Sequence, residues 1–327
     1  MKKALLANKK PFDKQRILFL SRIIGAKTRR VLWLIIRTML IIGISFVILY
    51  PLIIKLSVSI MSQSDMLDTS VRWVAKSPTF DNFVRAIQIM NFWEAFKNTA
   101  VMSILVTVLQ VSTCTLASYA FARLKYPGSK IVYILMIFTL IAPPQTYMIG
   151  MYSQFRFFDP FGLVSMIRGT AGLMNTFIPM AAKAFFGTGI RNGLYVYIMV
   201  QFFRNVPNEL EEAAHVDGAS SFKTFMSVMI PNAVPAIVTI SVFSIVWQWN
   251  DSFFSTLFTP QTSFLSSNLY NIDDMIKKID ERIFNTPAYA SVLKNAAALL
   301  VAFPIILLFI GAQKFFVENL ERSGIVG

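Results

Sequence analysis

Apolar residues gather into six long segments that are separated by polar stretches. Each segment has about 20 residues or more, which is enough for an α-helix to cross the hydrocarbon core of a membrane. Because backbone inside that core must satisfy its own hydrogen bonds, the pattern predicts an all-α, polytopic membrane protein with six transmembrane helices. The predicted spans are residues 31–61, 98–121, 131–152, 175–203, 235–258 and 291–310.

We predict that two of these spans are interrupted, whereas the first and sixth each contain one proline, Pro51 and Pro304. Pro143 and Pro144 interrupt the third span. In the fourth span, an otherwise apolar run is interrupted by Pro179, Lys183, Gly187, Gly189, Arg191, Asn192 and Gly193. We predict a discontinuous helix there. Such a break is tolerated at membrane depth only against other protein or a water-filled cavity.

The polar stretch 208–231, between the fourth and fifth spans, has its own pattern. It predicts two short helices around a turn at Asp217-Gly218, with Ser220 or Ser221 capping the second helix. That second helix carries apolar residues at i, i+3, i+4 and i+7, which are Phe222, Phe225, Met226 and Met229. We predict a helical hairpin with a polar side and an apolar stripe that docks onto a partner.

Composition agrees with a membrane protein and excludes several other classes. Of the 327 residues, 55% are hydrophobic, and mean hydropathy is +0.57. A single Cys and a single His exclude a disulfide framework and a His/Cys metal cluster. The sequence has no phosphate-binding loop and no nucleophile–base constellation, so we predict neither nucleotide binding nor catalysis by this chain.

Basic residues are distributed unevenly between the two sides of the predicted membrane. The chain carries 31 Lys and Arg against 17 Asp and Glu, a net charge of +14. Six spans place both termini on one side, which receives 18 of the basic and 7 of the acidic residues. The positive-inside rule therefore predicts that the N-terminus, the hairpin and the C-terminal tail are cytoplasmic. This topology explains the net charge without a nucleic acid partner.

A basic N-terminal segment, residues 1–30, precedes the predicted transmembrane domain at 31–327. It contains ten Lys or Arg and one acid, Asp13. We predict a cytoplasmic segment that lies against anionic membrane lipid. A solvated tail is the alternative interpretation.

Two groups of polar and aromatic residues are candidates for a substrate pathway. Near the end of the fifth span lie Trp247, Trp249, Asn250 and Asp251. Aromatic faces can stack on sugar rings, and amide or carboxylate groups can bind sugar hydroxyls, so these residues are candidates for contact with a sugar. An interfacial aromatic belt is the alternative. In the fourth span, Lys183, Arg191 and Asn192 are costly inside a membrane and predict a cavity lining. The two cations could equally pair with an acid on a partner subunit.

The hairpin carries a family resemblance. Residues 212–231 (EAAHVDGASSFKTFMSVMIP) resemble the cytoplasmic EAA loop of ABC importer permeases. Further similar segments follow in the family's order: NTAVMSI from Asn98, SYAFARLKYPG from Ser118, FFRNVPNELEEAA, WQWNDSFF and FVENLERSGIVG. The chain is thus similar to the carbohydrate (maltose-type) branch of binding-protein-dependent transport inner-membrane components. The resemblance covers about residues 35–327, with the transport core near 95–315.

This resemblance implies a division of labour among several subunits. It implies the type I ABC importer permease fold in a bacterial inner membrane, with no cofactor bound by this chain. ATP and Mg would bind to a cytoplasmic ABC ATPase dimer. The other implied partners are a second homologous permease, giving a heterodimer, and an extracytoplasmic solute-binding protein. The implied cargo is a sugar, an oligosaccharide that could be acidic. A non-sugar solute, or an ATP-independent secondary transporter, is the alternative.

The resemblance also assigns the residues that couple the permease to the ATPase. The implied coupling residues are Glu209, Glu211, Glu212, Ala213, Ala214, Asp217, Gly218, Ala219, Phe225 and Pro231. Gly218 would permit the turn, the small alanines would allow close approach, and the carboxylates would meet basic groups on the partner. For Glu209 and Glu211, a solvated position without a contact is the alternative.

Overall fold

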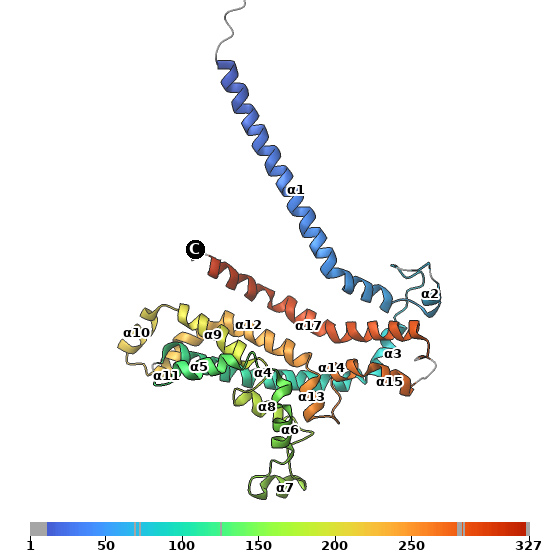
Figure 1. Cartoon of the computed structure of the whole chain (residues 1–327), viewed down its shortest axis with the longest axis vertical. Helices are drawn as coiled ribbons and strands as arrows, with labels where there is room; N and C mark the ends of the chain where they lie inside the picture. Colours follow the sequence, from blue (N-terminus) through green and yellow to red (C-terminus); the bar gives the residue numbers. More distant parts are fainter. Residues whose placement is uncertain are drawn as a thin grey trace, which may run out of the picture. The chain divides into compact units, whose positions relative to one another are not determined.

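The computed structural model describes residues 12–324 except 69, 72, 125, 280–282 and 284, with side chains described between residues 29 and 315. Every regular element in this part of the chain is helical (Figure 1). The chain divides into two compact units, residues 1–57 and 58–327. The predicted basic segment begins outside the described residues, so its position on lipid stays a prediction, as does its boundary at residue 30.

Helix α1 (Phe12–Ser59) makes up the described part of the first unit. Between Arg29 and Ser59 it is long and apolar enough to cross a membrane. Its apolar side chains, Leu40 and Ile42 among them, are exposed along the helix. A long helix that is apolar and unburied on all sides suits a lipid environment. It corresponds to the first predicted span.

Helix α4 (Phe92–Arg123) is the central helix of the second unit. Its neighbours are α8 (Ile178–Phe185), α9 (Asn192–Asn205) and α12 (Ile230–Trp249), and α12 also packs against α17 (Pro287–Gly324). Three stretches of this unit are long and apolar enough to cross a membrane: Phe92–Arg123, Ser221–Trp249 and Pro287–Phe315. They correspond to the predicted second, fifth and sixth spans.

The third and fourth predicted spans are broken helices. The third consists of α5 (Ser129–Phe138), a short 3-10 turn η1 (Pro144–Tyr147) and α6 (Met148–Arg156). The fourth consists of α8 and α9, separated by residues 186–191. Both breaks lie where the prolines and glycines of the sequence predict them.

The fifth span ends earlier than the sequence predicts. Helix α12 stops at Trp249, and α13 (Phe253–Phe258) begins after a short gap. The Asp251 carboxylate explains this break, because it accepts hydrogen bonds from the backbone N–H groups of Phe254 and Ser255 at 3.2 and 3.1 Å. A carboxylate in this position caps a new helix N-terminus rather than continuing the old one.

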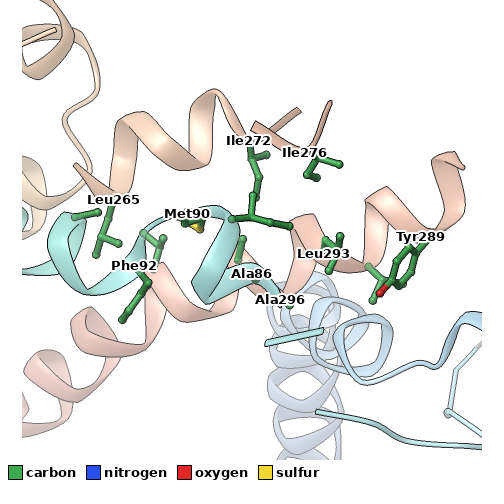
Figure 2. Close-up of a cluster of buried hydrophobic side chains, with 14 of the residues drawn as sticks. Ala86, Met90, Phe92, Leu265, Ile272, Ile276, Tyr289, Leu293 and Ala296 are labelled. Atoms are coloured by element: carbon green, nitrogen blue, oxygen red, sulfur yellow. The ribbon is translucent and has the colours of Figure 1, made fainter. Parts of the chain in front are cut away.

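The two ends of the bundle in the second unit differ. At one end lie α10 (Asn208–Val216) and α11 (Ser221–Thr224), and at the other lie α3 (Asp81–Ile89) and α15 (Ile272–Ile279) (Figure 1). Figure 2 shows the buried cluster that joins α3, α4, α15, α17 and α14 (Leu265–Tyr270). Short helices complete the unit: α2 (Gln63–Leu67), η2 (Pro160–Gly162), α7 (Leu163–Arg168) and a π-helical turn η3 (Phe225–Met229).

Candidate functional site

A cavity of about 1240 Å³ lies beside the broken helices. Its lining includes residues of α5, η1, α6, α8, the gap before α9, the start of α9, the end of α12 and the start of α13 (Phe253–Phe258). Irregular backbone at membrane depth needs such a cavity or a protein neighbour, since lipid offers no hydrogen bonds. The cavity that the fourth span predicts is therefore present where the helix breaks.

Glycine and an unusual backbone conformation shape the break between α8 and α9. Gly187 and Arg191 have φ angles of +73° and +61°. The second is uncommon for a residue with a side chain and is found more often at functional sites. Gly189 is packed so closely that a Cβ there would lie 2.9 Å from Asn192 Oδ1. A larger residue at this position would displace the side chains of Asn192 and Gln110.

A buried polar network fastens this break to the rest of the bundle. Gln110 Nε2 of α4 donates to the Ile190 carbonyl at 2.5 Å and to Asn192 Oδ1. Ser244 of α12 donates to Gln110 Oε1 at 2.7 Å, and its hydroxyl lies 2.9 Å from that of Thr107. The network ties α4, α9 and α12 together. Sequence reasoning missed Gln110, although a lone amide in an apolar span is a usable signal.

The charged residues of the fourth span lie against aromatic rings. Lys183 is 6% exposed, and its Nζ lies 3.3 Å from the ring centroid of Phe254. The guanidinium carbon of Arg191 lies 4.5 Å from the ring of Trp247. Both are cation–π contacts, which stabilise a cation without neutralising its charge.

Six of the seven predicted pathway residues line the cavity: Lys183, Arg191, Asn192, Trp247, Asn250 and Asp251. Trp249 does not. It is 5% exposed, its Nε1 donates to the Val301 carbonyl at 3.0 Å, and its ring packs edge-to-face on Phe96. Residues two positions apart on an α-helix are separated by roughly 200° around the helix axis. The side chains of Trp247 and Trp249 therefore lie on opposite sides of α12.

Sequence reasoning also missed part of the polar lining. Gln145 and Tyr147 line the cavity within three residues of the Pro143-Pro144 break, and Gln154 lines it from α6, the helix that follows. Polar side chains just beyond a helix break are a signal that could have found them. The sequence predicted the break, but the polar residues that follow it were not identified as lining a cavity.

The hairpin at the end of the bundle has the predicted form. Helix α10 ends with the N–H of Ala219 bonded to the Ala214 carbonyl and the N–H of Gly218 bonded to the His215 carbonyl. This is a Schellman motif with glycine at the left-handed position, where Gly218 has φ +78°. The Ser220 side chain then accepts the Lys223 N–H at 3.3 Å and caps α11.

The apolar stripe predicted for the second helix is wrong as a single face. Phe225 and Met229 are buried in the chain's own core, where Phe225 packs on Tyr119 and Phe203. Phe222 and Met226 are exposed. The π-helical turn at Phe225–Met229 changes the helical period and divides the stripe in two.

The outer surface of the hairpin combines acidic and apolar side chains. Exposed residues on it include Leu210, Glu212, Val216, Asp217, Phe222 and Met226. Glu209, Ala213, Gly218 and Pro231 are exposed as well, whereas Ala214 and Ala219 are half-buried. Val216 is 87% exposed, which leaves a large aliphatic side chain without cover in this unit. Such a mixed patch suits a protein partner better than water alone.

Glu211 points inward instead. Its carboxylate lies 3.5 Å from Nε of Arg123 at the end of α4, and the two side chains are 14% and 10% exposed. Arg123 also donates to the Phe203 and Val206 carbonyls and to Asn208 Oδ1. One arginine therefore fastens the end of α9 and the start of α10 to α4.

Curated proteins similar to this chain over most of its length are permeases. The osmoprotective compounds uptake permease protein GgtD of Synechocystis is 26% identical over 292 residues, covering 87% of this chain and 90% of that protein. The melibiose/raffinose/stachyose import permease protein MelC of Bacillus subtilis is 28% identical, covering 85% and 91%. The maltodextrin transport system permease protein MdxG of the same organism is 27% identical, covering 93% and 100%.

Two solved structures have a similar fold. One is a bacterial ABC transporter involved in the import of the acidic polysaccharide alginate, with a TM-score of 0.66 at 20% identity over 90% of this chain and 97% of that chain. The other is a bacterial alginate ABC transporter in complex with an alginate pentasaccharide-bound periplasmic protein, with a TM-score of 0.57 at 17% identity over 86% and 92%. These similarities confirm the predicted all-α permease fold.

The sequence profile of one protein family covers most of the second unit. It matches residues 100–322, which include the cavity, the hairpin and the helices that join them. Together with the long apolar helices of the bundle, this match identifies a multi-pass membrane protein. The chain belongs to the family of binding-protein-dependent transport system inner membrane components.

Proposed function

We propose that this chain is a membrane-spanning permease subunit of an ATP-driven ABC importer that moves an oligosaccharide into the cell. Relatives named for the transport of maltodextrin and of melibiose, raffinose and stachyose support the sugar class. The polar and aromatic lining of the cavity, with Trp247 and Asn250 among it, is suited to a hydroxyl-rich solute. The chain itself transports and does not catalyse a reaction.

One observation carries this proposal: two helices join the hairpin to the cavity. Helix α9 starts at the cavity with Asn192 and ends three residues before α10. Helix α12 starts at Ile230, at the end of the hairpin, and reaches the cavity with Trp247 and the following Asn250. These helices have 14 and 20 residues, which at about 1.5 Å per residue makes them rigid links roughly 20 and 30 Å long. A displacement of the hairpin would therefore move the parts of the cavity lining that belong to α9 and α12.

The exposed hairpin supports a proposal for the remaining parts of the importer. The exposed acidic and apolar patch of the hairpin, with Glu212, Val216 and Phe222, would dock into a cytoplasmic ATPase dimer that binds ATP and Mg. A second homologous permease would complete the pathway as a heterodimer, and an extracytoplasmic binding protein would deliver the sugar. In this orientation both termini are cytoplasmic, as the distribution of Lys and Arg favours.

Reconstitution of the whole importer tests the proposal. The full-length chain is purified with its ATPase, second permease and binding protein, and uptake of labelled maltodextrin-type and other oligosaccharides into liposomes is measured. We expect uptake only with ATP and Mg on the hairpin side and the loaded binding protein on the other side. Uptake driven by an ion gradient without ATP would contradict an importer of this kind. ATP-dependent uptake of a non-sugar solute alone would contradict the sugar class.

A further inference from the structure

The cavity has an excess of positive charge. Of the lining residues that the structure describes, the charged ones are Lys183, Arg191 and Asp251. Both carboxylate oxygens of Asp251 are occupied by backbone N–H groups of α13, and the Lys183 ammonium lies on the Phe254 ring. The Arg191 side chain has no carboxylate within 4 Å and no side-chain hydrogen bond to any residue in the described part of the chain. Arg191 is exposed and lines the cavity.

Trp247 contacts this arginine through the face of its aromatic ring. The guanidinium carbon lies 4.5 Å from the indole ring, and Trp247 is 42% exposed. Stacking on an aromatic face occupies the flat side of the guanidinium and leaves the N–H groups around its edge available. Those edge groups form the fork that matches a carboxylate with two parallel hydrogen bonds.

A second donor without a partner lies beside Arg191. Asn192 lines the cavity and is 5% exposed, and its Nδ2 has no hydrogen-bond partner among the described residues. An unpaired donor at this depth is costly, and native proteins usually pair such groups. Asn192 is also the first residue of the 14-residue helix α9, so the positive end of the helix dipole lies at the same place.

We propose that the cavity binds an oligosaccharide that carries carboxylates, a uronate, and that Arg191 takes the carboxylate. The start of α9, with Asn192 as its first residue, adds positive potential, and Trp247 offers its remaining face to a sugar ring. This inference rests on the proposed function, because it names the class of sugar that the importer moves. Neutral oligosaccharides would leave Arg191 without its partner.

Uptake by the reconstituted importer, compared between uronate and neutral oligosaccharides of matched length, tests the inference. We expect the wild-type importer to prefer the uronate. Arg191→Gln should lower uronate uptake by about tenfold or more, the size expected for a lost charge-assisted hydrogen bond, and should affect neutral sugar less. Arg191→Lys should restore part of the preference because it keeps the charge.

Arg204→Gln is the matched control. Arg204 is at the other end of α9, also lies on an aromatic ring, at 5.5 Å from that of Tyr133, and does not line the cavity. It should leave the uronate-to-neutral ratio unchanged. Two results would overturn the inference while the proposed function stands. One is uptake of neutral sugar without uptake of uronate by the wild-type importer. The other is an equal loss of both uptakes in Arg191→Gln, as expected for an arginine that pairs with the partner permease. Absence of ATP-dependent uptake of either sugar would instead contradict the proposed function.

Discussion

Arg123 lies at the end of α4 and contacts four groups between the end of α9 and the first turn of the hairpin. Its partners are the carboxylate of Glu211, the side chain of Asn208 and the carbonyls of Phe203 and Val206. The sequence places Glu211 with the carboxylates that would face a partner, yet the structure turns it toward its own chain. A pair separated by 88 positions cannot be found from either local pattern.

We expect Arg123→Gln and Glu211→Gln to loosen the hairpin. Removing one member of a largely buried ion pair leaves the other unpaired, which destabilises by roughly 1–3 kcal/mol at this depth. The complex should hydrolyse more ATP per sugar moved. The ratio of uptake to ATP hydrolysis, measured for both variants and the double variant, checks this. If the two effects simply add, the residues do not act as a pair.

Trp247 and Trp249 provide a second comparison at this scale. Trp249→Ala removes a buried indole that donates to Val301, so we expect a loss of about 3–5 kcal/mol in stability and poor assembly. Trp247→Ala should leave assembly intact and reduce uptake. Thermal unfolding and uptake of the two purified variants separate the roles. A stable Trp249→Ala complex with reduced uptake would return Trp249 to the pathway.

At the scale of elements, the turn between α10 and α11 depends on one backbone conformation. Gly218 has φ +78°, and a Cβ built on it meets nothing within 4 Å. A substitution there is therefore strained by the backbone alone and not by a steric clash. The sequence predicted this turn because glycine directly after a helix is a local signal.

Gly218→Val should weaken coupling far more than Gly218→Asn. A β-branched residue at positive φ costs about 1–2 kcal/mol, whereas asparagine visits this region more readily. We expect Gly218→Val to retain ATP hydrolysis with little uptake, and Gly218→Asn to keep most uptake. Both activities are measured in the same liposomes. Equal uptake in the two variants would show that the left-handed turn is not required.

Across the whole molecule, the sequence predicted the elements better than their faces. Six apolar segments, two broken spans and the capped hairpin follow from local composition, since prolines, glycines and caps act within a few residues. The end of α12 was missed because the Asp251 cap lies inside an aromatic run. The position of Trp249 was missed because the side of a helix that meets a cavity depends on where its neighbours pack.

The central claim is that movement of the hairpin changes the cavity, and thiol labelling at Asn250→Cys tests it most directly. Asn250 lines the cavity and is exposed, while the only native cysteine, Cys114, is 1% exposed and gives little background. The labelling rate by a membrane-impermeant reagent is measured in the complete importer with and without trapped ATP. The account predicts a large change, about tenfold, that is lost in Gly218→Val. An unchanged rate while ATP is hydrolysed would contradict it.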